Sequence, residues 1–428
     1  MKRILTSLFL IVVATTVSAQ SQMTLENAID TALKNNFDIR ISRTASAIAE
    51  ANNTAGNAGM LPTVSVISSI GIDHSDQRTN NGGSVTTSAY SFVSGHAYVQ
   101  LNWTLYDGGK MFVTRQKLRE TSSLGDIRFN ETVQAKMYEV VGAYYDLIRL
   151  KQQLRSVQQT IRYNQERVTI AQAGFTAGSL SKPDLLQAKT DLNGVLETAI
   201  TQEFAIREGQ RYLNALLARN TETPLIVGDS IPDNYQPNRE DLIRQLNASN
   251  VSLLAFQKQV EINRLALKET KSYYLPRFDV NAIYTISGTR QISSVGSSSS
   301  LTPNVSGSLT IPIYQAGENN RKKRVAELTV ESSQSDLENL KLQLNLALQN
   351  ALNDFDNQKA LLKIEEENNL MTKEYLEISI QRLKLGQTNS LEVHLAQETF
   401  MNSNTRLIDY RFGLKLAETK LRQLVSAL

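Results

Sequence analysis

The sequence predicts a mainly α-helical fold with a membrane β-barrel part, built as a duplicated unit of long antiparallel helices plus two β-hairpins. Three observations lead to this prediction. Two blocks of more than 60 residues contain almost no helix breakers. Two other segments alternate apolar and polar residues with the period of a strand, and the same order of features occurs twice along the chain, as expected of an internal duplication.

The composition excludes several classes of function. The chain has 428 residues, a formal net charge of +3, three His and no Cys. Disulfides, thiolate metal sites and catalytic cysteines are therefore excluded, and three scattered histidines offer little for a zinc centre. We find no Ser/His/Asp order and no phosphate loop. We expect no enzymatic activity, no metal, no cofactor and no nucleic-acid partner.

The first 19 residues have the features of a signal peptide. Lys2 and Arg3 precede the apolar run Ile4–Val17, and Ser18-Ala19 then completes a small-residue cleavage pattern before Gln20. A retained anchor is the alternative, but the run of about 14 residues is shorter than the roughly 20 needed to span a bilayer. No other apolar run is long enough for a transmembrane helix, so we expect export either as a soluble protein or as a β-barrel.

Two long helices are expected over Lys110–Ala173 and Glu318–Leu385, because neither block contains Pro and the second also lacks Gly. Their lengths at 1.5 Å per residue are about 96 and 102 Å, so each needs continuous partners. Shorter helical blocks can supply them two at a time, laid end to end. These blocks are Thr24–Ala58, Lys182–Ala218, Arg239–Tyr273 and Ser390 to the C-terminus.

One stretch of the second long block has the period of a strand, because four leucines alternate with other residues from Leu342 to Leu348. We still predict a helix there. In a helix, Leu342 and Leu346 form one stripe and Leu344 and Leu348 form another on roughly the opposite side. Such a helix packs against neighbours on both flanks.

Strand patterns occur in two places, each between a short and a long helical block. Val99, Leu101, Trp103 and Leu105 form the clearest apolar parity. Strands of about ten residues with one apolar and one polar face suit a transmembrane barrel, and a soluble sandwich is the alternative. The other strand-forming apolar residues are Val64, Val66, Ile70, Ile72, Phe278, Val280, Ala282, Tyr284, Ile286, Val305, Leu309, Ile311 and Ile313.

The duplication appears as paired motifs. Leu61-Pro62 recurs as Leu275-Pro276 before the hairpins, and beyond the hairpins the offset is a constant 208 residues. The predicted parts are a signal peptide (1–19), a first repeat (20–218, hairpin 61–106), a linker or equatorial segment (219–238) and a second repeat (239–428, hairpin 275–314).

The motifs together resemble the TolC-like outer-membrane efflux protein family. The resemblance rests on Met23–Ile29 with Ala32–Asn36, on Leu61-Pro62, on the turn Tyr106–Gly109 and on the two Gly-centred helix turns. It implies a homotrimer in which each protomer gives four strands to a twelve-stranded barrel in the outer membrane of a Gram-negative-type cell. An α-helical periplasmic tunnel would continue the barrel. Four strands by themselves leave open edges that lipid does not tolerate.

The resemblance also places the functional residues at the helix turns. Ala177, Gly178 and Ser179, and likewise Leu385, Gly386 and Gln387, resemble the tip motif that contacts a periplasmic adaptor (a membrane fusion protein). Helix C-cap glycine is the structural explanation of each Gly. Asp184 and Glu392 match acidic positions at the tunnel mouth and are pore or gate candidates, although acids are also ordinary at a helix start.

The function implied is an outer-membrane exit duct of a tripartite efflux or type I secretion system. Such a duct conducts substrates passively from periplasm to exterior when coupled to the adaptor and an inner-membrane pump. A soluble periplasmic adaptor or scaffold with long helices is the alternative, although its helical hairpin would normally occur once. Here a helical hairpin accompanies each of the two strand pairs.

Overall fold

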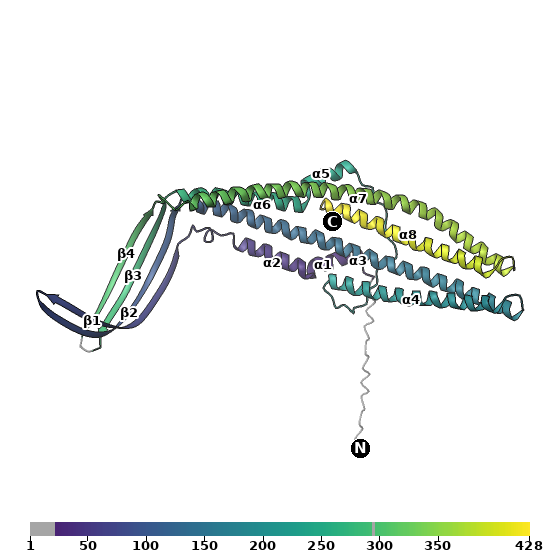
Figure 1. Ribbon diagram of the computed structural model, residues 1–428, viewed down its shortest axis with the longest axis horizontal. Coiled ribbons are helices and arrows are strands. Elements are labelled where there is room, and N and C mark those ends of the chain that lie inside the picture. Colours follow the sequence, from purple (N-terminus) through teal and green to yellow (C-terminus); the bar gives the residue numbers. More distant parts are fainter. Residues whose placement is uncertain (1–21, 293–295) are drawn as a thin grey trace, which may run out of the picture.

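The computed structural model describes residues 22–292 and 296–428, so the expected signal peptide lies outside the described residues. The protomer is a long rod of helices with a four-stranded sheet bent away from one end (Figure 1). The helices are α1 (Leu25–Asn35), α2 (Phe37–Ala51), α3 (Lys110–Thr176), α4 (Lys182–Leu216), α5 (Arg239–Ser249), α6 (Val251–Glu269), the 3-10 helix η1 (Thr270–Tyr274), α7 (Glu318–Lys384) and α8 (Ser390–Leu424).

The arrangement of the helices confirms the pairing expected from their lengths. The long helix α3 packs against α2 near the sheet and against α4 beyond it, and α7 packs against α6 and α8 in the same way. Helix α3 also contacts α6 and α8, which joins the two halves side by side. Leu344 belongs to the packing around the buried Leu348, whereas Leu342 and Leu346 on the other stripe of α7 are exposed.

The strands are β1 (Thr63–Asn81), β2 (Ser84–Asp107), β3 (Arg277–Gln291) and β4 (Ser297–Thr310), and they form one antiparallel sheet in the order β1-β2-β3-β4. Directly paired residues share a face of an antiparallel sheet. Val66 pairs with Val99, which pairs with Tyr284 on β3. Most of the expected apolar residues therefore lie on one continuous face, and the outer strands β1 and β4 are its edges. Three expectations are wrong: Leu105 falls in a register shift between Thr104 and Tyr106, and Ile311 and Ile313 lie beyond the end of β4 at Thr310.

The first hairpin extends further than its apolar pattern. Beyond Ile72 the side chains are mostly polar, yet β1 continues as a regular strand to Asn81, with Asn81 opposite Ser84. The partner ladder between β2 and β3 ends at Phe92 and Gln291. The hairpin of β1 and β2 therefore projects past β3 and β4, because the β1–β2 ladder continues where the second hairpin has already turned (Figure 1).

Two predicted helices are wrong in detail, because each is interrupted by a buried asparagine. Asn36 separates α1 from α2, and Asn250 separates α5 from α6. The side-chain nitrogen of Asn36 donates to the Leu216 carbonyl oxygen at 2.8 Å, and that of Asn250 donates to the Leu424 carbonyl oxygen at 2.8 Å. Each side-chain oxygen caps the helix that follows. The breaks therefore satisfy the carbonyl ends of α4 and α8 where they meet α2 and α6 end to end.

The first predicted helix is also too long at its end. Helix α2 stops at Ala51, and residues 52–58 form turns instead of continuing to Ala58. The side chain of Asn57 donates to the Asn52 carbonyl oxygen at 2.9 Å, so a local hydrogen bond replaces the helical one.

Candidate functional site: the helix tips and the seam between the hairpins

The turns that join α3 to α4 and α7 to α8 have the same geometry. At the first, the amide of Ser179 donates to Gly174 at 2.9 Å and the amide of Gly178 donates to Phe175 at 3.1 Å. These two bonds define a Schellman motif. Gly178 and Gly386 adopt φ values of +76° and +69°, in the left-handed region that favours glycine. The two turns lie together at the end of the rod remote from the sheet (Figure 1).

The second turn repeats the motif and exposes an apolar side chain. The amides of Gln387 and Gly386 donate to Arg382 and Leu383 at 2.9 and 3.0 Å. The side chain of Leu385, which directly precedes Gly386, is 70% exposed. A rigid backbone turn with an exposed leucine can contact a partner protein without rearrangement.

Asp184 is held by the start of its own helix. Its carboxylate accepts hydrogen bonds from the backbone amide of Ser181 at 3.0 Å and from the Ser181 hydroxyl at 2.5 Å. The backbone amide of Asp184 donates to the Ser181 side-chain oxygen at 3.4 Å, which completes a capping box. The bond from the Ser181 side chain lowers the pKa of Asp184, and the backbone bond adds to this effect. The carboxylate is therefore ionised at neutral pH.

Glu392 is neutralised within its own protomer. Its carboxylate pairs with the Arg382 guanidinium at 2.6 Å and accepts a hydrogen bond from the Thr388 hydroxyl. Its backbone amide donates to the Asn389 side chain at 2.9 Å. The Glu392 side chain is 27% exposed. This pairing, which the sequence alone did not indicate, cancels much of the negative charge expected at the tunnel mouth.

A second polar cluster joins the two helical hairpins close to the tips. Arg167 of α3 is 2% exposed; its guanidinium pairs with Asp191 of α4 and donates to the Gln397 side chain of α8 at 2.9 Å. His394 of α8 lies 3.1 Å from the same Asp191 carboxylate. The Nε of Arg167 has no hydrogen-bond partner among the described residues. Asp191 therefore bridges a buried cation and the neighbouring hairpin.

The same seam contains a further ion pair between the hairpins. Lys384 at the end of α7 lies 2.6 Å from Glu166 of α3. Tyr163 of α3 packs against the buried cluster of Leu376, Ala396 and Phe400, which belongs to the α7/α8 hairpin. Contacts within one protomer thus hold the two hairpin tips together.

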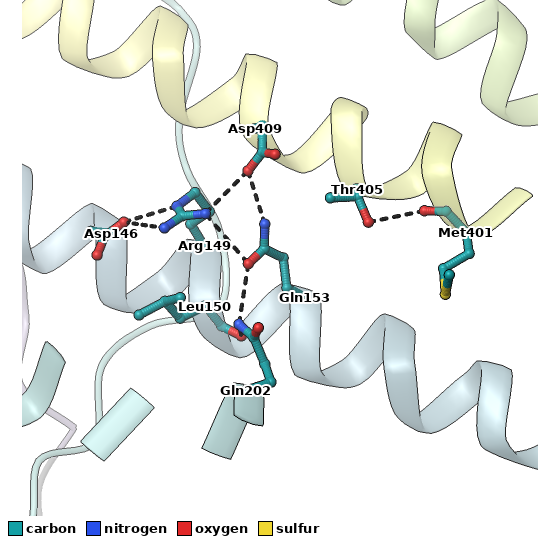
Figure 2. Close-up of polar contacts among 8 residues, drawn as sticks. All are labelled: Asp146, Arg149, Leu150, Gln153, Gln202, Met401, Thr405 and Asp409. Carbon is teal, nitrogen blue, oxygen red and sulfur yellow. Dashed lines mark hydrogen bonds and ion pairs between the residues drawn. The ribbon is translucent and has the colours of Figure 1, made fainter. Parts of the chain in front are cut away.

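Further from the tips along the seam, a network of charged and amide groups links α3, α4 and α8 (Figure 2). Arg149 contacts Asp146 on its own helix at 2.7 Å and Asp409 of α8 at 3.2 Å. Gln153 donates to Asp409 at 2.9 Å and accepts a hydrogen bond from Gln202 of α4 at 3.1 Å. Much of the seam is therefore polar and only partly buried, unlike the apolar packing within each hairpin.

The structure brings the predicted tip residues together at one end of the rod, but the two acidic residues have different hydrogen-bond partners. Residues 177–179 and 385–387 form equivalent turns, and Asp184 and Glu392 occupy equivalent positions at the starts of α4 and α8. Sequence reasoning missed Arg167, Asp191 and Arg382. A single sequence does not distinguish a buried Arg or Asp in a long helix from one that is exposed to solvent, so the sequence signal for these residues is weak.

A family comparison identifies the chain. The sequence model of the outer membrane efflux protein family matches residues 28–219 and 242–427. The chain belongs to the outer membrane efflux protein family. It is therefore an outer-membrane protein, and the soluble adaptor alternative is not supported.

Individual relatives agree with this assignment. The protease secretion protein PrtF of Dickeya chrysanthemi is 23% identical over 423 residues, covering 95% of this chain and 88% of PrtF. The outer membrane efflux protein BepC of Brucella suis biovar 1 is 22% identical over 416 residues, covering 93% of this chain and 84% of BepC.

The solved structures confirm the fold class. The outer-membrane channel OprN superposes with a TM-score of 0.79 at 15% identity, covering 94% of this chain and 90% of OprN. The outer membrane protein VceC of Vibrio cholerae superposes with a TM-score of 0.75 at 14% identity, covering 94% of this chain and 96% of VceC. The fold is that of trimeric outer-membrane efflux channels with a helical tunnel and a barrel. None of the helices in the described ranges is long and apolar enough to cross a membrane.

Proposed function

We propose that three copies of this chain form a passive exit duct in the outer membrane, coupled to a periplasmic adaptor and an inner-membrane pump. The observation that carries this proposal is the single apolar face across the four strands. The outer edges of β1 and β4 pair with no other strand among the described residues of the protomer. An open edge in lipid is costly, and pairing β4 of one copy with β1 of the next removes it.

Exposed apolar stripes on the helices support the same assembly. Leu342 and Leu346 on α7 are 71% and 58% exposed, and Phe37 and Ile41 on α2 are 63% and 66% exposed. Within the protomer α7 packs against α6 and α8, and α2 packs against α3, so both helices have a free flank. A threefold arrangement brings the free flank of α7 against the α2 side of the next copy, which buries both stripes.

The tips are the proposed adaptor contact. The two Schellman turns at residues 177–179 and 385–387 present equivalent backbones, and the exposed Leu385 adds apolar surface. Three copies give six such turns around the tunnel mouth. The role of Gly178 and Gly386 is to hold this shape, because a residue with a Cβ is strained at their φ values.

The seam between the hairpins is the proposed gate. Opening the tunnel mouth requires the α7/α8 hairpin to move against α3/α4, and this motion breaks the Arg167–Gln397, Asp191–His394 and Lys384–Glu166 contacts. Asp184 and Glu392 remain proposed pore residues. Their influence on conduction is limited by the Ser181 and Arg382 partners described above.

The names of the relatives suggest two cargo types. PrtF and the alkaline protease secretion protein AprF of Pseudomonas aeruginosa are named for protease secretion, and BepC is named for efflux. We propose that this chain serves one of these two kinds of system. Copurification of pump and adaptor with the crosslinked native complex distinguishes them.

Conductance tests the duct directly. The mature chain is purified in detergent and inserted into a planar bilayer, and single-channel currents are recorded for the parent and for a Lys384→Gln variant. We expect discrete conductance steps and a higher open fraction in the variant, because it loses an inter-hairpin ion pair. Absence of any conductance from both proteins, with trimers present in the bilayer, contradicts the proposal.

A further inference from the structure

We propose that the exit end of the barrel lumen contains a binding track for planar aromatic cations, formed in each protomer by Tyr90, Phe92, His96 and Tyr98 of β2 together with Asp73 of β1. This inference rests on the proposed barrel and specifies a class of solute that it binds. The track lies on the sheet face opposite the apolar, lipid-facing one.

The strand register fixes the face on which the aromatic row lies. The ladder between β1 and β2 is regular from Thr63 to Asn81, so side chains alternate without a slip. Val99 and Leu101 belong to the apolar face, and the even-numbered residues of β2 from Ser84 to Asn102 therefore lie on the other face. Hydrogen bonds confirm this placement. His96 bonds to the hydroxyl of Ser69, its direct partner on β1.

The row is unusual because the interior of a membrane barrel is ordinarily polar. Most neighbours on this face are Ser, Thr, Asn and Gln, such as Asn102, which accepts a hydrogen bond from Asn281 at 2.5 Å. An aromatic girdle at the membrane interface faces lipid, so it does not account for rings on this face. Aromatic side chains exposed to a water-filled lumen are available to stack on a solute.

The rings form two adjacent pairs along the strand. The ring centroids of Tyr90 and Phe92 are 6.0 Å apart, and those of His96 and Tyr98 are 6.0 Å apart with the planes inclined by 15°. At about 3.4 Å per residue, the row from Tyr90 to Tyr98 extends for about 27 Å. This length allows a flat solute to move from one ring to the next.

An open cleft at the end of the row offers polar partners beside the rings. Tyr90 and Phe92 line one side of the cleft, and the hydroxyl residues Thr289, Ser297 and Ser298 line the other. A solute with a flat apolar body and polar edges suits this lining, since stacking and hydrogen bonding are available together.

Charge selects the cationic members of this class. Asp73 is paired with Phe92 in the register, it is exposed, and it accepts a hydrogen bond from Ser94 at 2.8 Å. Within the described strands, it is the one carboxylate at the exit end of the luminal face. The other Asp and Arg side chains on this face lie near the helices: Arg277 pairs with Asp279, and Asp107 is opposite Arg277 in the register. Three Asp73 carboxylates beside three aromatic rows attract a cation, and aromatic faces also bind cations.

Ethidium, a planar aromatic cation, is the probe for the test. Its fluorescence is titrated with the purified mature trimer in lipid nanodiscs, against empty nanodiscs. Stacking on one ring is worth roughly 5- to 150-fold in affinity. We expect Phe92→Ser/Tyr98→Ser to weaken binding at least tenfold, Phe92→Trp to retain it, and Asp73→Asn to weaken it several-fold at low salt only.

The matched control is Tyr284→Ser, which removes a ring from the apolar face of β3 at the level of Val99. It should bind ethidium as the parent does. Equal ethidium affinity of the Phe92→Ser/Tyr98→Ser variant and this control overturns the proposal. Competition by tetraethylammonium with the same affinity as ethidium also overturns it, because binding then depends on charge alone and not on stacking. Equilibrium binding does not require conduction. Failure of the duct therefore shows separately, as an absence of single-channel current.

Discussion

The turn at Gly386 allows the proposed adaptor contact to be tested by backbone conformation alone. An added Cβ at Gly386 meets no atom within 4 Å, so a substitution is not limited by space. The φ of +69° is the cost, about 1 to 3 kcal/mol for a residue held in this region and greatest for a β-branched one. Gly386→Val should therefore shift the equilibrium between the native turn and other turn conformations by roughly 5- to 150-fold away from the native turn. The native turn loses population to this extent where the strain exceeds the free energy by which the parent chain favours that turn.

Gly386→Asn is the matched control, because Asn tolerates the left-handed region while adding a side chain of similar size. The assay is a titration of nanodisc-held trimer with the periplasmic adaptor that copurifies after crosslinking of the native complex. We expect Gly386→Val to weaken the affinity for the adaptor by up to the same factor. The affinity of Gly386→Asn should stay within about threefold of that of the parent. Parent-like affinity of both variants refutes the reasoning, and equal weakening by both shows that side-chain bulk matters instead of φ.

The remaining predictions concern the tunnel mouth, the lipid face and the helix junctions. Because Glu392 and Arg382 neutralise each other, Arg382→Gln should make single-channel currents more cation-selective and Glu392→Gln less so; no shift in either variant excludes both side chains from the pore. Val99→Arg should cost about 2 to 4 kcal/mol on the lipid face, whereas the luminal Gln100→Arg should be tolerated, as judged by trimer yield in outer-membrane fractions. Asn250→Ala should destabilise the tunnel by about 1 to 3 kcal/mol, visible as a lower midpoint of helix unfolding by circular dichroism, since it leaves the Leu424 carbonyl unpaired.

The two long helices and the strand faces could be predicted because their signals are local. Residues 318–385 contain no Pro or Gly, and the apolar parity of the strands is retained in the observed register up to the shift between Thr104 and Tyr106 in β2 and the end of β4 at Thr310. The alternation from Leu342 to Leu348 was correctly assigned to a helix. In the proposed trimer, a neighbouring copy covers its exposed stripe, Leu342 and Leu346.

The helix breaks could not be predicted, because their cause is tertiary. Asn is only mildly unfavourable within a helix, and nothing near Asn36 in sequence indicates that Leu216 supplies a carbonyl for it. The contacts of the proposed gate share this difficulty. Arg167 and Gln397 lie 230 residues apart, and only the folded seam brings them together.

The partners of the acidic tip residues show a similar limit. The position of Glu392 at a helix start follows from the sequence, but its ion pair depends on Arg382 reaching across the turn from α7. The repeat offset pairs Glu392 with Asp184, whose partner is Ser181 instead. Equivalent positions in the duplication thus have different electrostatic environments.

Crosslinking between edge strands tests the trimeric duct most directly. The chain has no native Cys, so a Thr63→Cys/Thr310→Cys variant reports only the introduced pair. These positions lie at the helix-proximal ends of β1 and β4. After treatment of intact cells with a short bismaleimide, the account predicts covalent dimers and trimers in the outer-membrane fraction, with each single-Cys variant remaining monomeric on a denaturing gel. Recovery of the double variant as an uncrosslinked periplasmic monomer that needs no detergent contradicts it.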